Sequence, residues 1–308
     1  MNEFSVYTTN YISGVMSLRK PQEESLVILD KILNAVHLEK SMNQKQALET
    51  VHSMYPICTD FERDFMSLTF ALATGVGKTR LMGAFIAYLY TNHNIQNFFV
   101  VAPNTTIYEK LQRDLSDINS PKYVFRGLSC FANQPHIITG EEYTKPLTTF
   151  QSEVRIFIFN IDKFNKENSN MKQVSDYHEK SFFATLANLP DLVLIMDESH
   201  HYHGEKGEQA LNELHAVLGL ELTATPLTAK KKSGKQIPFR NVVYEYPLSQ
   251  AIADGYTRTP YAVTRSDIDF YHFGEEQLDK LMLQDGILCL IRTSGINYGY
   301  ILQTMPND

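Results

Sequence analysis

Hydrophobic and polar positions along the chain form two alternating kinds of segment. Short runs of almost wholly apolar residues predict strands that are buried on both faces. The clearest of these runs are residues 65–72, 97–102, 154–159, 191–196 and 218–222. Between them, apolar residues recur at helical spacing from about 77, over 107–115, and over 177–187, 205–218 and 247–254. Strands that alternate with helices predict an α/β fold with a mostly parallel sheet and helices on both faces.

The chain ahead of the first strand has a helical pattern. Apolar residues lie on one face of a predicted helix over 22–36, which follows Pro21, a residue suited to a first helical turn. We therefore predict a helical N-terminal extension (1–64), a sheet-containing domain (65–245) and a C-terminal arm and tail (246–308). Weaker patterns predict a strand at 122–128, a short strand and turn at 137–140, and surface loops at 163–175 and 230–235.

Composition restricts the class of protein. The chain has 308 residues, 43% of them hydrophobic and 20% charged, and its net charge of −7 gives no overall basic field for nucleic acid. Contact with nucleic acid must therefore be local. Cys58, Cys130 and Cys289 lie far apart, without metal-site spacing or a disulfide framework. No signal-peptide core is present, and no apolar run approaches the roughly 18 residues that span a bilayer. We expect a soluble cytoplasmic protein without membrane contact.

The first strand leads into a glycine-rich turn that ends in Lys78-Thr79 and opens a helix. A helix N-terminus after a tight glycine turn binds anions, because its first amides have no partner within the helix. Gly75 and Gly77 allow the backbone to curl around an oxyanion. Lys78 is suited to the β- and γ-phosphates of a nucleotide, and Thr79 to Mg²⁺. Leu72 stands where the full P-loop pattern has its first glycine, so a simple turn before a core helix is the alternative.

Two carboxylates follow the apolar run 191–196. Asp197 is suited to hold Mg²⁺ opposite Thr79, and Glu198 to orient or deprotonate an attacking water. The alternative is an acidic surface turn. Gln22 begins the predicted helix in the N-terminal extension, and its carboxamide can pair with the edge of adenine. The alternative there is a solvated glutamine.

Four of these polar segments follow directly after predicted strands. They are the P-loop, Pro103-Asn104, Asp197-Glu198 and Thr223-Ala224-Thr225. Because parallel strands end at the same edge of a sheet, we expect the four segments to lie together, where ligands bind in such folds.

In chain order, ATGVGKT, VVAPNTT, DESHH and LTATP resemble motifs I, Ia, II and III of superfamily 2 helicases and translocases of the DExH type. SLRKPQ resembles the adenine-reading Q motif. DESHH and YEYPLSQAIADGYTRTPYAV are most similar to the motor subunits of type I and type III restriction enzymes. The resemblance covers about residues 15–265. It implies a RecA-like P-loop domain that hydrolyses ATP with Mg²⁺ and moves on duplex DNA, with modification or specificity subunits of a restriction system as possible partners.

The resemblance also assigns roles to residues. Gln22 would read adenine, and the nucleotide would be held by Thr74, Gly75, Val76, Gly77, Lys78, Thr79 and Arg80. Thr79 and Asp197 would hold Mg²⁺. The catalytic residues would be Glu198, Lys78 and His200. Coupling between nucleotide and DNA would pass through His200, Thr223, Ala224 and Thr225. DNA phosphates would be contacted by Pro103, Asn104 and Thr105, and Thr139-Gly140 is similar to a further backbone-contacting motif.

The chain also departs from the family. Motors of this type have a second RecA-like domain with arginine fingers in a Q-x-x-G-R-x-x-R box, which is not found here. The arginines after residue 226 are Arg240, Arg258, Arg265 and Arg292. An arginine finger contributes about 10³–10⁵ in rate, so we expect poor hydrolysis by this chain alone, which resembles a motor truncated after its first domain. No PD…(D/E)xK nuclease set is recognised either.

Three alternatives follow. The chain could be a non-catalytic nucleotide-binding or interaction fragment. It could instead be a zinc hydrolase, because Glu198 is accompanied by His200, His201, His203 and His215, although no H-E-x-x-H spacing is present. The KKKSGK loop at 230–235 could grip phosphates, but a solvated loop is the simpler interpretation.

Overall fold

The computed structural model describes residues 3–139, 154–161, 179–202, 205–228 and 236–258, with single positions at 280, 283 and 284. The chain divides into two units, Met1–Thr257 and Arg258–Asp308, and all helices and strands named below belong to the first. The predictions for Gly140, for the loops at 163–175 and 230–235, for His203, and for Cys289, Arg265 and Arg292 lie outside the described residues.

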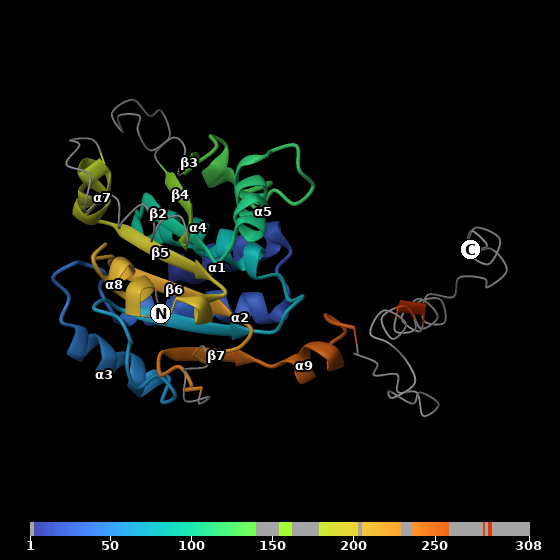
Figure 1. Cartoon of the computed structure of the whole chain (residues 1–308), viewed down its shortest axis with the longest axis horizontal. Coiled ribbons are helices and arrows are strands. Elements are labelled where there is room, and N and C mark those ends of the chain that lie inside the picture. Colours follow the sequence, from blue (N-terminus) through green and yellow to red (C-terminus); the bar gives the residue numbers. More distant parts are fainter. Residues whose placement is uncertain are drawn as a thin grey trace. The chain divides into compact units, whose positions relative to one another are not determined.

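The core of the first unit is a seven-stranded sheet whose strand pairs are all parallel. Figure 1 shows it as a twisted layer between two sets of helices. From one edge to the other, the strands are β3 (His136–Thr139), β4 (Arg155–Asn160), β2 (Asn97–Ala102), β5 (Leu192–Asp197), β6 (Leu218–Thr223), β1 (Ser67–Leu72) and β7 (Val242–Tyr246). The predicted α/β fold with a parallel, RecA-like sheet is confirmed.

In β2, β4 and β5, alternate residues enter two different hydrophobic clusters, because successive side chains of a strand point to opposite faces. Phe98 and Val100 of β2 belong to one cluster, and Phe99 and Val101 to the other. The first cluster includes residues from α1 (Glu3–Met16), α2 (Lys20–Ala35), α3 (Gln44–Met54), α4 (Lys78–His93) and α5 (Thr105–Ser116). The second includes residues from α7 (Glu179–Asn188) and α8 (Glu205–Asn212). Helices therefore cover both faces, and the N-terminal helices belong to the same compact unit as the sheet.

A buried polar cluster lies between β1 and β6. The Glu221 side chain is fully buried, and its Oε1 accepts hydrogen bonds from Arg63 Nε at 3.2 Å and from Ser67 Oγ at 2.8 Å. Asn241 Nδ2 donates to the same oxygen at 3.3 Å. Arg63 is also buried and supplies the balancing charge. The pair is a structural feature of the core, since burial of an unpaired carboxylate would be costly.

The structure differs from the sequence-based predictions in three segments. The strand predicted at 122–128 is wrong, because the segment forms turns, followed by the short 3₁₀ helix η1 (Ser129–Phe131), and its apolar side chains pack into the core without pairing. The helix predicted to reach 218 ends at Asn212, and a left-handed residue, His215, with φ 48°, lies between it and β6. Strand β7 was not predicted, because the partly exposed Tyr244 and the exposed Glu245 interrupt the apolar run.

Candidate functional site

Four polar segments meet at the carboxyl edge of the sheet. β1, β2, β5 and β6 all run parallel and end there, and each continues directly into one of the segments that the sequence singles out. In Figure 1 the arrowheads of these strands point to this edge, which also receives the N-termini of α4 and α5. The structure therefore brings the four motifs together, as expected for a parallel sheet.

The P-loop connects β1 to α4 through two residues in the left-handed region. Gly75 has φ +84° and Gly77, which precedes the first residue of α4, has φ +100°. A Cβ on Gly77 would lie 2.6 Å from Gln22 Nε2. Val76, between them, is buried, whereas Thr74 and both glycines are exposed. The loop therefore has the backbone shape and the close contacts that only glycine supplies, and it opens a helix N-terminus to solvent.

Lys78 and Glu198 form an ion pair across the site. Lys78 Nζ lies 2.9 Å from Glu198 Oε1, and the two side chains are 11% and 23% exposed. Glu198 has a left-handed backbone, with φ 49° and ψ 54°. Such a conformation is uncommon for a residue with a Cβ and is concentrated at functional sites. Lys78 is the first residue of α4, and Glu198 follows β5, so their contact joins the P-loop to the acidic segment.

Asp197 lies beside this pair and is 6% exposed. Burial, together with the neighbouring Glu198 carboxylate, raises the pKa of Asp197 from 3.8 to about 6, while Lys78 and Lys110 act in the opposite direction. The Glu198 amide donates to Asp197 Oδ1 at 3.1 Å. Lys110 Nζ also donates to Thr79 Oγ1 at 3.4 Å. The carboxylate of Asp197 and the hydroxyl of Thr79 are oxygen donors of the kind that Mg²⁺ prefers.

A chain of polar contacts leads from the acidic segment to the turn after β6. His200 Nδ1 lies 3.7 Å from Glu198 Oε2 and 3.1 Å from Thr223 Oγ1. The Thr223 hydroxyl in turn accepts from the Thr225 amide at 3.1 Å. Ala224 is half-buried, and Thr225 is exposed. The predicted coupling residues are therefore in contact with Glu198 through His200.

Gln22 is 1% exposed and bonds to the P-loop. Its Nε2 donates to the Gly77 carbonyl oxygen at 2.8 Å, and its Oε1 accepts from the Arg19 amide at 2.8 Å. A carboxamide has two N–H groups and two lone pairs, so one of each remains for a further partner such as an adenine edge. Arg80, by contrast, donates to the carbonyl oxygen of Met16 at the end of α1.

The predicted DNA-contacting residues lie at the start of α5. Asn104 and Thr105 are exposed, whereas Pro103 is buried. Asn104 Oδ1 caps the helix by accepting from the Ile107 amide at 2.9 Å. Thr139 is buried at the end of β3.

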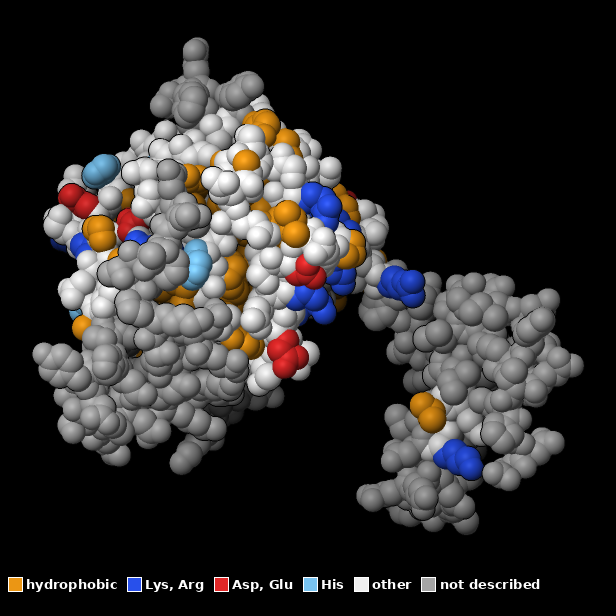
Figure 2. All heavy atoms as spheres, turned by 90° about the horizontal axis from the view of Figure 1, so that it is seen from above, with side chains coloured by type: hydrophobic (Ala, Val, Ile, Leu, Met, Phe, Trp, Pro, Cys, Tyr) orange, Lys and Arg blue, Asp and Glu red, His pale blue; other side chains and the backbone are white. Residues whose placement is uncertain are grey.

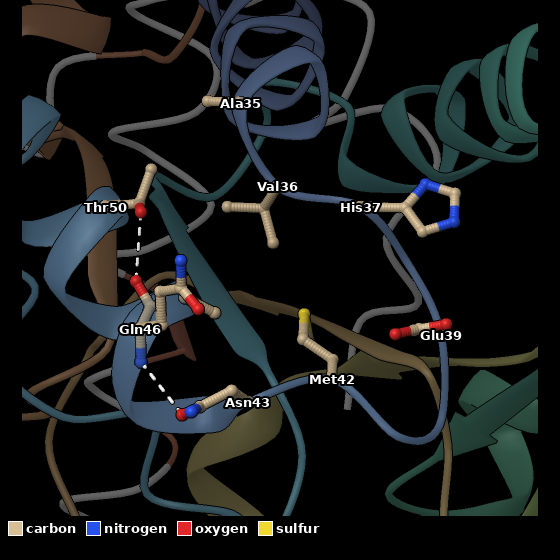
Figure 3. A pocket seen from close by; sticks show the side chains of 9 residues that line it. Ala35, Val36, His37, Glu39, Met42, Asn43, Gln46 and Thr50 are labelled. Atoms are coloured by element: carbon tan, nitrogen blue, oxygen red, sulfur yellow. Dashed lines mark hydrogen bonds between the residues drawn. The ribbon is translucent and has the colours of Figure 1, made fainter.

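A cavity of about 220 Å³ lies elsewhere, where α2 is followed by α3 (Figure 3). Val36 and Met42 give it an apolar wall. Two of its polar residues bond within α3, since Gln46 N donates to Asn43 Oδ1 and Thr50 Oγ1 donates to Gln46 O. None of the residues that line it was predicted to be functional. Within the described ranges, no group of three or more His, Cys, Asp or Glu side chains could hold a metal ion, and no described helix is long and apolar enough to cross a membrane.

Comparison with known protein families shows to which family this chain is related. The family described as the res subunit of type III restriction enzymes matches residues 16–228, which include the P-loop, the acidic segment and the turn after β6. The chain belongs to this family. No curated protein sequence is significantly similar to the chain.

Three solved structures are similar to this res-family chain. A nuclease-deletion mutant of the type ISP restriction-modification enzyme LlaGI, in complex with a DNA substrate mimic, has 11% identity and a TM-score of 0.41 over 84% of this chain and 23% of that one. The type ISP enzyme LlaBIII bound to DNA has 14% identity and a TM-score of 0.39, over 68% and 15%. The Sulfolobus solfataricus SWI2/SNF2 ATPase core in complex with dsDNA has 15% identity and a TM-score of 0.34, over 59% and 31%. The chain thus spans less than a third of each.

Four residues near the P-loop of the res-family domain were not singled out for this site from the sequence. They are Arg19, Lys110, Tyr256 and Thr257. Lys110 is on α5 and contacts Thr79, while Arg19 and Thr257 each donate a hydrogen bond to a P-loop carbonyl oxygen. Local sequence gives no signal for such contacts, because the partners are separated by 31 to 183 positions.

Proposed function

We propose that this res-family chain binds ATP with Mg²⁺ at its P-loop and hydrolyses it as the motor domain of a DNA-directed translocase of restriction-enzyme type. The observation that supports this most strongly is the 2.9 Å contact between Lys78 Nζ and Glu198 Oε1. It brings a cationic phosphate ligand and a candidate catalytic base within reach of the same bound group, at a helix N-terminus suited to anions.

The residues present fit a magnesium-bound triphosphate. Gly75 and Gly77 supply the left-handed backbone of the turn before α4, and the Lys78 ammonium would neutralise charge on the β- and γ-phosphates. Thr79 and Asp197 would hold Mg²⁺ with oxygen ligands. When bound, the ion would offset further negative charge on the phosphates. Phosphates at the loop would share Lys78 with Glu198 and so free the carboxylate for its catalytic role.

In the proposed reaction, a water oxygen forms a bond to the γ-phosphorus, and the bond from that phosphorus to the β–γ bridging oxygen breaks. ADP and inorganic phosphate are the products. Glu198 accepts the proton of the attacking water, a role that general bases fill at a gain of about 10²–10⁴ in rate. His200 positions Glu198 and connects it to Thr223, so the turn after β6 would respond to the state of the nucleotide.

DNA is the proposed track, and its contact would be local. Asn104 and Thr105 are exposed at the start of α5, whose first-turn amides favour a phosphate. Among the described residues on the face shown in Figure 2, Lys and Arg side chains lie in more than one place, and the largest group has acidic side chains beside it. This distribution agrees with the net charge of −7 and favours a few specific phosphate contacts over a broad basic surface. Modification or specificity subunits of a restriction system are the proposed protein partners.

A second candidate function is nucleotide binding without efficient turnover. Arg240 favours it, since this described arginine pairs with Asp60 at 2.9 Å and with Glu62 at 3.2 Å, so it is engaged in surface ion pairs. An arginine finger contributes about 10³–10⁵ to the rate of related reactions. A chain that relies on another domain or protein for this group would bind ATP but turn it over slowly.

Phosphate release, measured with and without duplex DNA, separates the two candidates. The wild type should release phosphate, and DNA should accelerate it. Glu198→Gln should retain ATP binding and lose about 10²–10⁴ in rate, as removal of a general base predicts. Lys45→Ala, on the exposed surface of α3, is the control and should match the wild type. A wild type that binds ATP without turnover under either condition favours the second candidate, and a wild type that binds no ATP contradicts both.

A further inference from the structure

The segment that follows α9 (Leu248–Ala253) lies against the P-loop. Thr257 Oγ1 donates a hydrogen bond of 2.7 Å to the Thr74 carbonyl oxygen. A Cβ added to Gly75 would lie 2.9 Å from Thr257 Oγ1 and 3.4 Å from the Tyr256 carbonyl oxygen. The segment therefore packs directly on the peptide between Thr74 and Gly75. In Figure 1, α9 follows the carboxyl end of β7, at the same edge of the sheet as the nucleotide site.

Tyr256 makes a second, indirect contact with the loop. The guanidinium of Arg19 lies 5.0 Å from the centre of the Tyr256 ring, in cation–π geometry, and Arg19 Nη1 donates to the Gly75 carbonyl oxygen at 2.6 Å. Two successive carbonyl groups of the P-loop, those of Thr74 and Gly75, are thus held by Thr257 and by Arg19 with Tyr256.

Holding a carbonyl group also orients an amide. The peptide unit is planar and trans, so the N–H of the next residue points opposite to the fixed C=O. The bond from Thr257 to the Thr74 oxygen therefore sets the direction of the Gly75 amide, in a loop whose function depends on where its amides point. Gly75 alone would not hold this direction, because glycine adopts φ +84° as readily as negative values.

The segment itself is anchored to the sheet. The amides of Tyr256 and Thr257 donate to the Ala251 carbonyl oxygen at 2.9 and 3.2 Å. Tyr246, at the end of β7, accepts from the Ala73 amide at 3.0 Å through its carbonyl oxygen and donates to Asp254 Oδ2 at 2.6 Å through its hydroxyl. Strand β7 and the turn after α9 therefore hold Tyr256 and Thr257 at a fixed place beside the loop.

We propose that Tyr256 and Thr257 are positioning residues of the nucleotide site, which hold the P-loop in its phosphate-binding conformation. This inference rests on the proposed ATP site, and it adds a link from that site to Thr257, where the compact unit ends. By thermodynamic linkage, a segment that favours nucleotide binding is itself favoured by bound nucleotide. Occupation of the P-loop should therefore stabilise residues 251–257.

Equilibrium titration with a fluorescent ATP analogue and Mg²⁺ tests the proposal. Thr257→Val keeps the shape of the side chain and loses the hydroxyl, so affinity should fall by about two- to tenfold, the range for one net hydrogen bond. Thr257→Ser restores the donor and should bind like the wild type. Thr50→Val is the matched control, because Thr50 also donates to a backbone carbonyl, that of Gln46 at 2.9 Å, but within α3. Thermal unfolding of each variant monitors folding.

Hydrogen exchange supplies a readout that a merely structural role would not change. The analogue should slow exchange of the amides in 251–257 in the wild type and in Thr257→Ser, and less so in Thr257→Val. If the wild type binds the analogue and Thr257→Val binds it equally well, without altered protection, the positioning role is overturned while the ATP site stands. If the wild type does not bind, both are overturned.

Discussion

Gly77→Ala is the substitution whose effect can be worked out most fully from the structure. Gly77 has φ +100° and precedes α4, and a Cβ there would lie 2.6 Å from Gln22 Nε2. That nitrogen is the end of a flexible side chain, so steric overlap alone is relieved cheaply. Gln22 is 1% exposed, however, and moving it breaks its bond to the Gly77 carbonyl oxygen. The substitution therefore adds backbone strain and removes a buried hydrogen bond.

The expected loss of unfolding free energy is the sum of these effects. A left-handed backbone costs a residue with a Cβ about 1–2 kcal/mol. Disturbing the bonds of the buried Gln22 carboxamide costs about 1–2 kcal/mol more. Alanine lowers the conformational entropy of the unfolded chain, which offsets about 0.5 kcal/mol of this loss. Gly77→Ala should thus destabilise the domain by about 2–3 kcal/mol.

Two other glycines serve as controls that separate the contributions. Gly255 has φ +73° and nothing within 4 Å of its added Cβ, so Gly255→Ala carries the strain alone, about 1 kcal/mol. Gly14 is helical, with open space around it and no positive φ, so Gly14→Ala should stabilise by about 0.5–1 kcal/mol. Urea unfolding of all three variants ranks their stabilities, because the midpoint of unfolding reports stability when the dependence of the unfolding free energy on urea concentration is the same.

Equal destabilisation by Gly77→Ala and Gly255→Ala would refute the role assigned to Gln22, because the two differ only in the buried contact. A stable Gly77→Ala would refute the left-handed conformation of the loop itself. A parallel titration with ATP should show the largest loss of affinity for Gly77→Ala, since Gly14 lies outside the site.

Further predictions concern buried polar groups. The pKa of Asp197 is raised from 3.8 to about 6, so the folded state binds this proton more tightly and the free energy of unfolding should fall as pH rises from 4 to 6. In the wild type the fall should amount to about 2–3 kcal/mol between pH 4 and pH 7.5, and Asp197→Asn should not show it. Urea unfolding at both pH values measures the free energy of unfolding; the same pH dependence in the wild type and in Asp197→Asn would contradict the raised pKa. Arg63→Met leaves Glu221 buried and unpaired and should cost about 3–5 kcal/mol, whereas the double variant Arg63→Met/Glu221→Leu should recover most of it; failure to recover would argue against the pair. Tyr88→Phe removes the hydroxyl that donates to Asp30 Oδ1 at 2.7 Å and should lower stability by about 1–3 kcal/mol, while an unchanged melting temperature would show that the bond contributes nothing.

Strands in the centre of the sheet could be predicted from sequence because burial on both faces removes polar residues. The run predicted at 97–102 coincides with β2, and all six of its residues are buried. β7 lies at an edge, where one neighbour is missing. Tyr244 is partly exposed and Glu245 is exposed, so the apolar signal is broken. Residues 122–128 show the opposite failure, since Val124 and Phe125 are buried without joining the sheet.

Some residues of the candidate site could be predicted from sequence, and others could not. Lys78, Asp197 and Glu198 could be recognised because each follows a strand within a short motif, and parallel pairing then brings the motifs together. Residues that reach the site through tertiary packing could not be recognised in this way. Thr257 meets Thr74 from 183 positions away, and Lys110 reaches Thr79 from another helix. Their sequence neighbours carry no motif of their own for phosphate binding.

Calorimetric titration of a non-hydrolysable ATP analogue with Mg²⁺ into the wild type and Lys78→Ala tests the ATP site most directly. Lys78 should contribute a charged hydrogen bond to the phosphates, so its removal should weaken binding by about ten- to a hundredfold. Lys45→Ala should bind like the wild type. Equal affinity of the wild type and Lys78→Ala for the analogue would contradict an ATP site built on Lys78 and Glu198.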